Sequence, residues 1–153
     1  INDVTAQMFL EDCNELFGFL VRDHGFSPGR LSIRRDVYRL RVDFLGKEIA
    51  AVCEFDWRDL APEVSIARFI NGEPARFRTE RIEGRTVYAK VLMSTILDMH
   101  KLPQHKVEPP ESKIEDSRAF WRSGLAPQAK TLKEHCGFLL KGGVSLLDEL
   151  PGC

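Results

Sequence analysis

The amino-acid sequence predicts an α+β domain in which helices pack on one face of an antiparallel sheet. From Val37 to Trp57, apolar and polar residues alternate on both sides of Gly46-Lys47, a pattern typical of a β-hairpin. Apolar residues at helical spacing precede this hairpin and return near the C-terminus. The order predicts an N-terminal helix, an antiparallel β-meander of three to four strands and an α-helical C-terminal tail.

Length and composition favour a single domain over residues 1–153. The proportions of hydrophobic residues (43%) and charged residues (29%) are ordinary for a globular protein. A net charge of −1 does not favour binding to nucleic acid or anionic membranes through overall charge. The chain contains no run of about 18 apolar residues, and its four cysteines show no CxxC spacing. We therefore expect no membrane association and a reducing, cytoplasmic setting.

The first helix is expected to run from a cap at Asn2 or Thr5 to about Asp23, with Gly25 as its C-cap. Its apolar residues recur at steps of three and four and form one stripe, while acidic residues such as Asp12 lie mostly on other faces. The stripe consists of Phe9, Cys13, Leu16, Phe17 and Leu20.

A short strand within the segment Phe26–Arg35 leads into the hairpin, whose register follows from a type II′ turn with Gly46 at positive φ. This register places Arg39 opposite Glu54, a favourable cross-strand pair. By alternation, Tyr38 and Trp57 belong to the apolar face. The apolar pairs on that face are Phe44 with Ile49, Val42 with Ala51, and Leu40 with Cys53.

A further strand is predicted at Glu63–Ile70, followed by a turn at Asn71-Gly72. The strongly charged segment Ala75–Gly84 fits an edge strand, a short helix or a loop. Thr86 is then expected to cap a helix that ends near His100. The expected buried face of this helix consists of Tyr88, Val91, Leu92, Thr95 and Met99.

Three prolines in residues 102–112 indicate a connector between a helix–sheet–helix body at 1–101 and a helical tail at 113–153. The tail shows helical patterns at about Ser112–Arg122 and Pro127–Lys141, separated by Gly124 and Pro127. Residues 144–150 are apolar enough to dock back on the body.

The sequence contains no GxSxG, Walker A, HExxH or GxGxxG motif, and we expect no catalytic site, metal or cofactor. His100 and His105 lack nearby ligands at metal-binding spacing. His135 and Cys136 are adjacent on a helix and point about 100° apart, so they do not form a nucleophile pair with each other.

Carboxylates are concentrated at the end of the hairpin, in the stretch EFDWRDLAPE. Period-2 alternation places Glu54 and Asp56 on one strand face, and Asp59 and Glu63 follow them. Three interpretations stay open: a solvated face with cross-strand arginine partners, an acidic partner-binding surface, and a catalytic carboxylate pair. The residues predicted to bind a partner are Glu54, Asp56, Trp57, Asp59 and Glu63.

Arginines form a second concentration in the predicted strands. A basic stripe on a sheet is typical of some RNA-binding modules, which also expose aromatic residues for base stacking. Here the strand aromatics share the face predicted to be buried, so nucleic acid is not the expected partner. The arginines are Arg30, Arg34, Arg35, Arg39 and Arg41, followed by Arg68, Arg76, Arg78, Arg81 and Arg85.

The segments GFLVRDHGF, VYRLRVDF and FDW, together with the tail LKEHCGFLLKGGVSLLDEL, resemble small bacterial α+β proteins, some of which are immunity proteins of polymorphic or contact-dependent toxin systems. The resemblance implies a non-enzymatic protein that neutralises a toxin by direct binding, with a basic toxin domain as the most concrete partner. It carries no functional residue over. The alternatives are a small enzyme of unrecognised type that uses the clustered carboxylates, and an oligomeric adaptor or structural protein.

Overall fold

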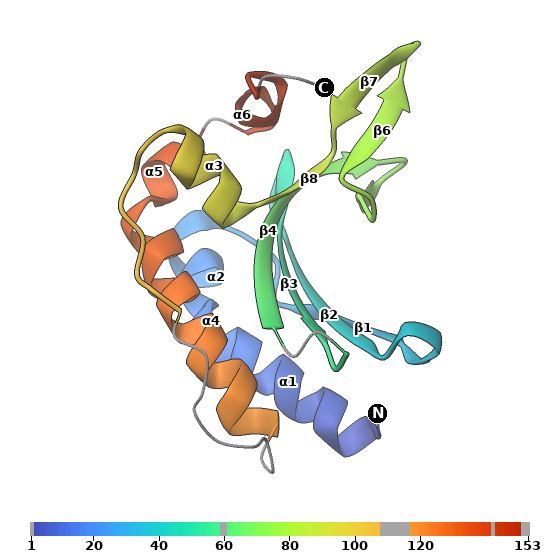
Figure 1. Cartoon of the computed structure of the whole chain (residues 1–153), viewed down its shortest axis with the longest axis vertical. Helices are drawn as coiled ribbons and strands as arrows, with labels where there is room; N and C mark the ends of the chain where they lie inside the picture. The colour runs from blue at the N-terminus through green and yellow to red at the C-terminus, as the bar shows by residue number, and fades with distance from the viewer. Residues whose placement is uncertain (1, 59–60, 108–116, 142, 151–153) are drawn as a thin grey trace.

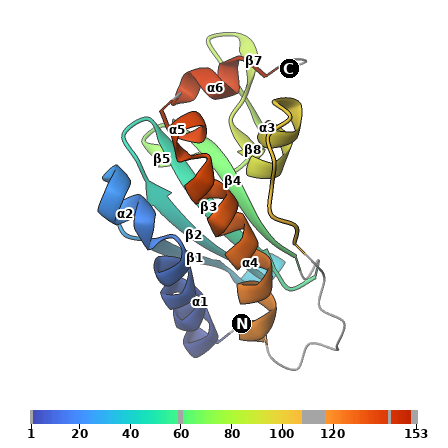
Figure 2. The same cartoon turned by 90° about the vertical axis from the view of Figure 1, so that its left-hand side faces the viewer.

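A computed structural model describes residues 2–58, 61–107, 117–141 and 143–150 of the chain. Figures 1 and 2 show the main helices on one face of a curved antiparallel sheet. The α+β prediction, with an N-terminal helix, an antiparallel sheet and a C-terminal helix, is confirmed. The helices are α1 (Asp3–Leu16), α2 (Gly18–His24), α3 (Met93–Met99), α4 (Ser117–Glu134), α5 (Cys136–Leu139) and α6 (Val144–Asp148). The strands are β1 (Arg30–Arg34), β2 (Arg39–Leu45), β3 (Ile49–Asp56), β4 (Ala61–Ile70), β5 (Glu73–Pro74), β6 (Thr79–Ile82), β7 (Arg85–Tyr88) and β8 (Lys90–Leu92).

The main sheet has the order β1-β2-β3-β4-β5, and β8 also pairs with β4. The predicted meander corresponds to β1 to β4, and β5 and β8 extend it at two different stretches of β4. Among the described strands, β1 pairs with β2 alone and therefore forms an edge of the sheet. Strands β6 and β7 form a separate hairpin that projects beyond the main sheet (Figure 1). Among the described residues, no helix combines the length and apolar character needed to cross a membrane.

The β2–β3 register differs by two residues from the predicted one: Phe44 lies opposite Ala51 and Arg39 lies opposite Asp56. The predicted type II′ turn at Gly46 is wrong, because the φ of Gly46 is not positive and its N–H donates to the Ile49 carbonyl at 2.9 Å. Lys47 and Glu48 therefore form the two-residue loop. Since side chains alternate with period 2, a shift of two residues leaves each of them on its predicted face.

The glycine at position 46 is needed for close packing instead of for positive φ. A Cβ there would lie 2.7 Å from the Ile49 carbonyl oxygen and 2.7 Å from the Phe26 ring. The strand on its N-terminal side also begins later than expected. Tyr38 has a left-handed backbone (φ 54°), follows the 3-10 turn Arg35–Val37 and is 54% exposed, so its predicted burial is wrong.

The predicted helix from Thr86 to His100 is wrong over its first half, where the chain forms β7 and β8. The β-branched residues of this stretch suit strands, and β6 and β4 offer backbone partners to them. Only Met93–Met99 is helical, and its buried residues are Met93, Ile96 and Leu97, while Leu92 and Met99 are exposed. The charged segment Ala75–Gly84, which sequence analysis left open, contains β6 and the turn into β7.

The predicted separation of two tail helices at Gly124 and Pro127 is wrong, because α4 continues through both residues. Gly124 allows α4 to lie directly on β4, since a Cβ there would overlap the ring of Pro62. Gln128 reinforces this contact: its amide nitrogen donates to the Pro62 carbonyl at 3.0 Å and its Oε1 accepts the Val64 N–H at 3.1 Å. Residues 112–116 of the first predicted tail helix lie outside the described residues.

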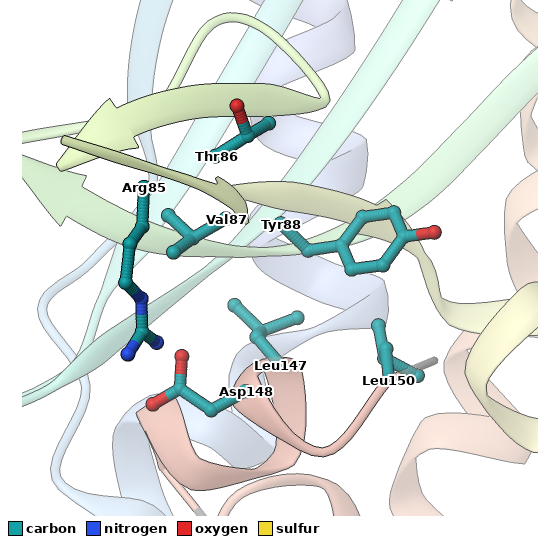
Figure 3. A pocket seen from close by; sticks show the side chains of 7 residues that line it. All are labelled: Arg85, Thr86, Val87, Tyr88, Leu147, Asp148 and Leu150. Atoms are coloured by element: carbon teal, nitrogen blue, oxygen red, sulfur yellow. The ribbon is translucent and has the colours of Figure 1, made fainter. Parts of the chain in front are cut away.

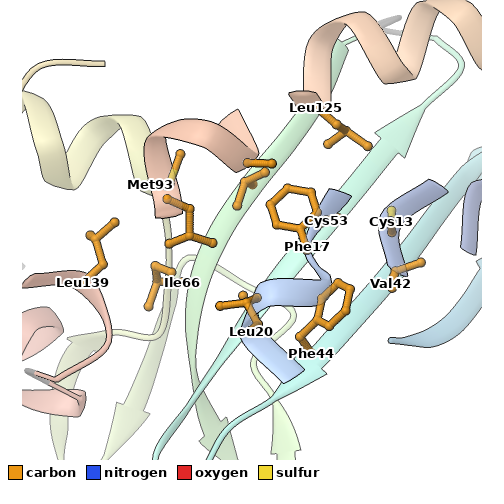
Figure 4. Close-up of a cluster of buried hydrophobic side chains, with 14 of the residues drawn as sticks. Cys13, Phe17, Leu20, Val42, Phe44, Cys53, Ile66, Met93, Leu125 and Leu139 are labelled. Carbon is orange, nitrogen blue, oxygen red and sulfur yellow. The ribbon is translucent and has the colours of Figure 1, made fainter. Parts of the chain in front are cut away.

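The predicted N-cap and C-cap of the first helical segment are confirmed: the Asn2 side chain accepts the Thr5 N–H at 2.7 Å, and Gly25 ends α2 with a left-handed backbone at φ 72°. The predicted single helix is interrupted at Phe17, which separates α1 from α2. Figure 4 shows how the apolar stripe of these helices packs on the sheet and on the tail helices. The fully buried residues in this contact include Phe9, Cys13, Phe17, Leu20, Val42, Phe44, Cys53 and Leu125.

Asp12 lies in the middle of this interface, although the helical pattern placed it mostly off the buried stripe. Its side chain is fully buried and accepts hydrogen bonds from Arg118, Trp121 Nε1 and Arg122 at 2.6 to 3.0 Å. Burial alone raises the pKa of Asp12, but these hydrogen bonds outweigh burial and lower the pKa below its usual value of 3.8. Asp12 is therefore ionised, and its carboxylate links α1 to α4 through the hydrogen bonds from Arg118, Trp121 and Arg122.

Replacement Asp12→Ala should lower the free energy of unfolding by about 3 kcal/mol, because it leaves the buried Trp121 N–H without an acceptor and removes two ion pairs. The neighbouring exposed carboxylate provides the control, and Glu11→Ala should cost less than about 1 kcal/mol. Urea unfolding at pH 7 measures both variants. Equal losses would show that the Asp12 contacts do not hold the two helices together.

Gly124→Ala should destabilise the protein by about 1–3 kcal/mol, because its new methyl group overlaps Pro62. Gly137→Ala is the matched control: Gly137 is exposed in α5, and a Cβ there meets no atom within 4 Å. That variant should be stabilised by about 0.5–1 kcal/mol through helix propensity. Thermal unfolding of both variants tests the close α4–β4 contact, and a stable Gly124→Ala protein would contradict it.

Candidate functional site

The candidate site lies on the face of the sheet opposite α1 and α4, which we call the open face. Along β2 and β3, one set of alternate residues packs on the helices, and the other set turns to the open face. The charged residues of the first three strands therefore gather there. They are Arg30 and Arg34 of β1, Arg39, Arg41 and Asp43 of β2, and Glu54 and Asp56 of β3.

Glu54 and Asp56, two of the predicted partner-binding residues, are only 7% and 6% exposed. Glu54 accepts from Lys90 Nζ at 2.7 Å and from Arg39 at 3.4 Å. Asp56 contacts Arg39 at 3.3 Å and Arg58 at 3.0 Å. The two carboxylates are thus held in ion pairs within the protein.

Hydrogen bonding from the Arg58 side chain is the main cause of a lowered pKa at Asp56. Burial of the carboxyl opposes this effect, while the Arg58 backbone N–H and the Arg39 side chain add to it, and the pKa falls from 3.8 to about 2. Asp56 is therefore charged at neutral pH. A carboxylate with such a low pKa does not supply a proton for general acid catalysis.

The remaining predicted site residues lie in different surroundings. The Trp57 ring packs against the rings of Phe55 and Trp121 of α4, with ring centroids 4.8 Å and 6.3 Å away. Trp57 therefore lies on the helix-covered side of the sheet. Glu63 is exposed on β4 and pairs in register with Glu54. Asp59 lies outside the described residues. The structure thus groups Glu54, Asp56 and Glu63 and separates Trp57 from the first two.

A pocket of about 440 Å³ opens on the open face between β1, β2 and residues 73–77. Five arginines and three carboxylates line it, which leaves a formal surplus of two positive charges. We call it the arginine pocket and define it by Arg30, Arg34, Arg39, Arg41 and Arg76. The other arginines of the sequence cluster, such as Arg35 and Arg85, do not line it.

Arg41 holds the two walls of the arginine pocket together. Its Nε donates to Asp43 at 2.6 Å, and its Nη2 reaches the Pro74 and Ala75 carbonyl oxygens at 3.4 Å. Asp43 and Ala75 are buried, so this part of the pocket is fixed. The wall formed by residues 73–77 ends in Phe77, a residue that is 68% exposed.

Sequence analysis missed the roles of Glu73 and Phe77, because they fall in or beside the charged segment whose structure the pattern did not determine. The sequence does contain one indication that Phe77 is exposed. Phe77 is an aromatic residue between two arginines, in a stretch with little other apolar content. A large apolar side chain that no helix or strand pattern buries is a candidate for exposure and contact.

A second pocket, of about 480 Å³, lies between β7 and the C-terminal segment (Figure 3). Its lining is mixed, with Val87, Leu147 and Leu150 beside Arg85 and Asp148. Asp148 binds Arg68 at 2.6 Å, and Arg68 Nε donates to the Tyr88 carbonyl at 2.8 Å. These contacts tie α6 to the end of the sheet.

His105 and His135 contact neighbouring segments of the chain, and Cys136 is buried. His105 lies 2.8 Å from Glu134, and His135 Nε2 contacts the Pro103 carbonyl at 2.7 Å, so both link residues 102–107 to the tail. Burial raises the pKa of the Cys136 thiol to about 11, which disfavours the nucleophilic thiolate. Across residues 2–58, 61–107, 117–141 and 143–150, no three His, Cys, Asp or Glu side chains are grouped to hold a metal ion.

The lowered pKa of Asp56 predicts a loss of stability in acid. The unfolded carboxyl binds its proton near pH 3.8 and the folded one near pH 2, so the contribution is complete above pH 3.8 and disappears as the pH falls to about 2. Asp56→Asn should flatten the decrease of unfolding free energy over this interval. Arg58→Gln should flatten it in part, because it removes the main cause of the shift. Urea midpoints between pH 5 and pH 2 measure the effect, and an unchanged slope in Asp56→Asn would refute it.

Comparison with known protein families, curated proteins and solved structures finds no match for this chain. The resemblance to immunity proteins stays a prediction. The assignment of function therefore depends on the charges, the exposed side chains and the geometry of the open face.

Proposed function

We propose that this protein functions by binding a protein partner through the open face, with the arginine pocket and Phe77 at the centre of the contact. The observation that carries the proposal is the combination of five arginines with a 68% exposed phenylalanine at one pocket. Arginine and aromatic residues are enriched in protein interfaces and among the residues that contribute most to binding energy.

The charge of the pocket defines the chemistry of the partner. Glu54 and Asp56 are neutralised by Lys90, Arg39 and Arg58 within the protein, so they have little charge left for a basic partner. The surplus at the arginine pocket is positive. The partner segment therefore carries acidic residues where it contacts this pocket, in contrast to the basic toxin domain expected from the sequence.

Neutralisation of a toxin by direct binding stays the most concrete form of this proposal. An inhibitor needs a rigid surface that is complementary to its target and no catalytic groups of its own. The sheet and helix layers provide rigidity, because their shared core is closely packed. The acidic segment would then belong to the toxin, for example at the rim of its active site.

A photo-crosslinking amino acid at position 77 tests this proposal in the organism that makes the protein. Val4 on α1 is the matched control, because it is 70% exposed, similar to Phe77 at 68%, and belongs to the helix layer. We expect one adduct of defined mass at position 77 and none at position 4. The added replacement Arg76→Glu should lower the yield about tenfold by placing a negative charge against the acidic partner.

Two results would refute this use of the open face. One is a set of the same adducts at positions 77 and 4, which would indicate random contacts. The other is the absence of any adduct at position 77 when the crosslinker is active in the purified protein. Identification of the adduct by mass spectrometry then tells whether the partner is a toxin.

A further inference from the structure

The carboxylate of Glu73 lies in the arginine pocket and contacts Arg30. Glu73 belongs to β5, which pairs with β4 at the far side of the sheet from β1. Its side chain nevertheless reaches Arg30 on β1, with Oε2 at 2.5 Å from Nη2 and Oε1 at 3.5 Å from Nη1. Two carboxylate oxygens thus face one guanidinium, the arrangement by which arginine recognises a carboxylate.

This internal contact is weakly held. The Arg30 side chain is 44% exposed and that of Glu73 is 65% exposed. An ion pair in such surroundings contributes little to stability, because water screens the charges and both side chains lose freedom. Another carboxylate that gains further contacts in the pocket can therefore take the place of Glu73.

The pocket offers such further contacts. Arg39 reaches Glu54 and Asp56 at 3.4 and 3.3 Å, longer than the usual 2.7 to 3.2 Å for an N–H···O bond, so its guanidinium has donors to spare. Arg76 is exposed and makes no hydrogen bond or ion pair within the part of the chain that the structure describes. Phe77 adds apolar surface beside these donors.

We infer that the arginine pocket is a carboxylate-binding site, that Glu73 occupies it in the free protein, and that an acidic residue of the partner displaces Glu73. This inference rests on the proposed function, since it names the group on the partner that the open face recognises. A carboxylate fits better than a phosphate chain, because Asp43, Glu54 and Glu73 lie among the arginines and would repel dense negative charge.

The test is a titration of the full chain with the peptide acetyl-Ala-Glu-Ala-Glu-Ala-amide, followed by the arginine Nε–Hε signals in NMR spectra. The matched peptide has glutamine in place of glutamate. We expect the signals of Arg30, Arg39 and Arg76 to shift with the glutamate peptide and to stay unchanged with the glutamine peptide. Citrate and inorganic phosphate form two further arms, which separate a peptide carboxylate from a free carboxylate and from phosphate.

Three variants sharpen the test. Glu73→Gln removes the carboxylate that competes with the peptide for Arg30. Peptide binding should therefore strengthen about two- to fivefold, the effect expected when one surface ion pair no longer has to be broken. Arg76→Gln should weaken it about fivefold or more. Arg85→Gln removes the same charge outside the arginine pocket and should leave the affinity unchanged.

Failure of the glutamate peptide to bind even to Glu73→Gln would overturn the inference, as would tighter binding of phosphate or citrate than of the peptide. An equal loss in Arg85→Gln and Arg76→Gln would also overturn it, because it would show an effect of net charge alone. These results are distinct from those of the crosslinking experiment. An adduct at position 77 without peptide binding would support the protein partner and refute the carboxylate site. Peptide binding without an adduct would support the carboxylate site and refute the use of the open face for a protein partner.

Discussion

The pairing of β2 with β3 is the constraint on which the rest of the structure depends. All eight residues of β3 are buried, so each of its side chains needs either apolar neighbours or a partner for its charge. On one face, Cys53 and Phe55 meet the helices, and on the other, Glu54 and Asp56 meet arginine and lysine side chains. The helix layer and the charge network are thus two consequences of the same central hairpin.

The elements that the sequence predicts well are those determined by local chemistry. The cap at Asn2, the C-cap at Gly25 and the alternation in β2, β3 and β4 depend on residues that are close in the chain. The predicted β2–β3 register differs from the observed one by two residues. A glycine at position 46 is compatible both with a turn at positive φ and with close packing against Phe26. Only tertiary packing distinguishes these two uses of glycine.

The errors further along the chain have a similar origin. Residues 85–92 carry an apolar pattern that fits a helix, but the free edges of β4 and β6 provide hydrogen-bond partners that the pattern does not reveal. Gly124 and Pro127 normally interrupt a helix, yet the contacts with Pro62 and Val64 favour a continuous α4. For the site, the alternation of residues placed Glu54 and Asp56 on the same strand face, as the structure does, but their ion pairs come from residues of other strands, such as Lys90 and Arg39.

The position of the arginine pocket at an edge of the sheet links recognition to solubility. In the part of the chain that the structure describes, strand β1 pairs with β2 alone, and an unpaired edge is a template on which a second chain can add a strand. Arg30 and Arg34, which stand on this edge, place charged, half-exposed side chains beside the path of an approaching copy. Variation that neutralises these two arginines to change partner preference would at the same time remove a guard against self-association, so the edge restricts how freely such a site can diversify.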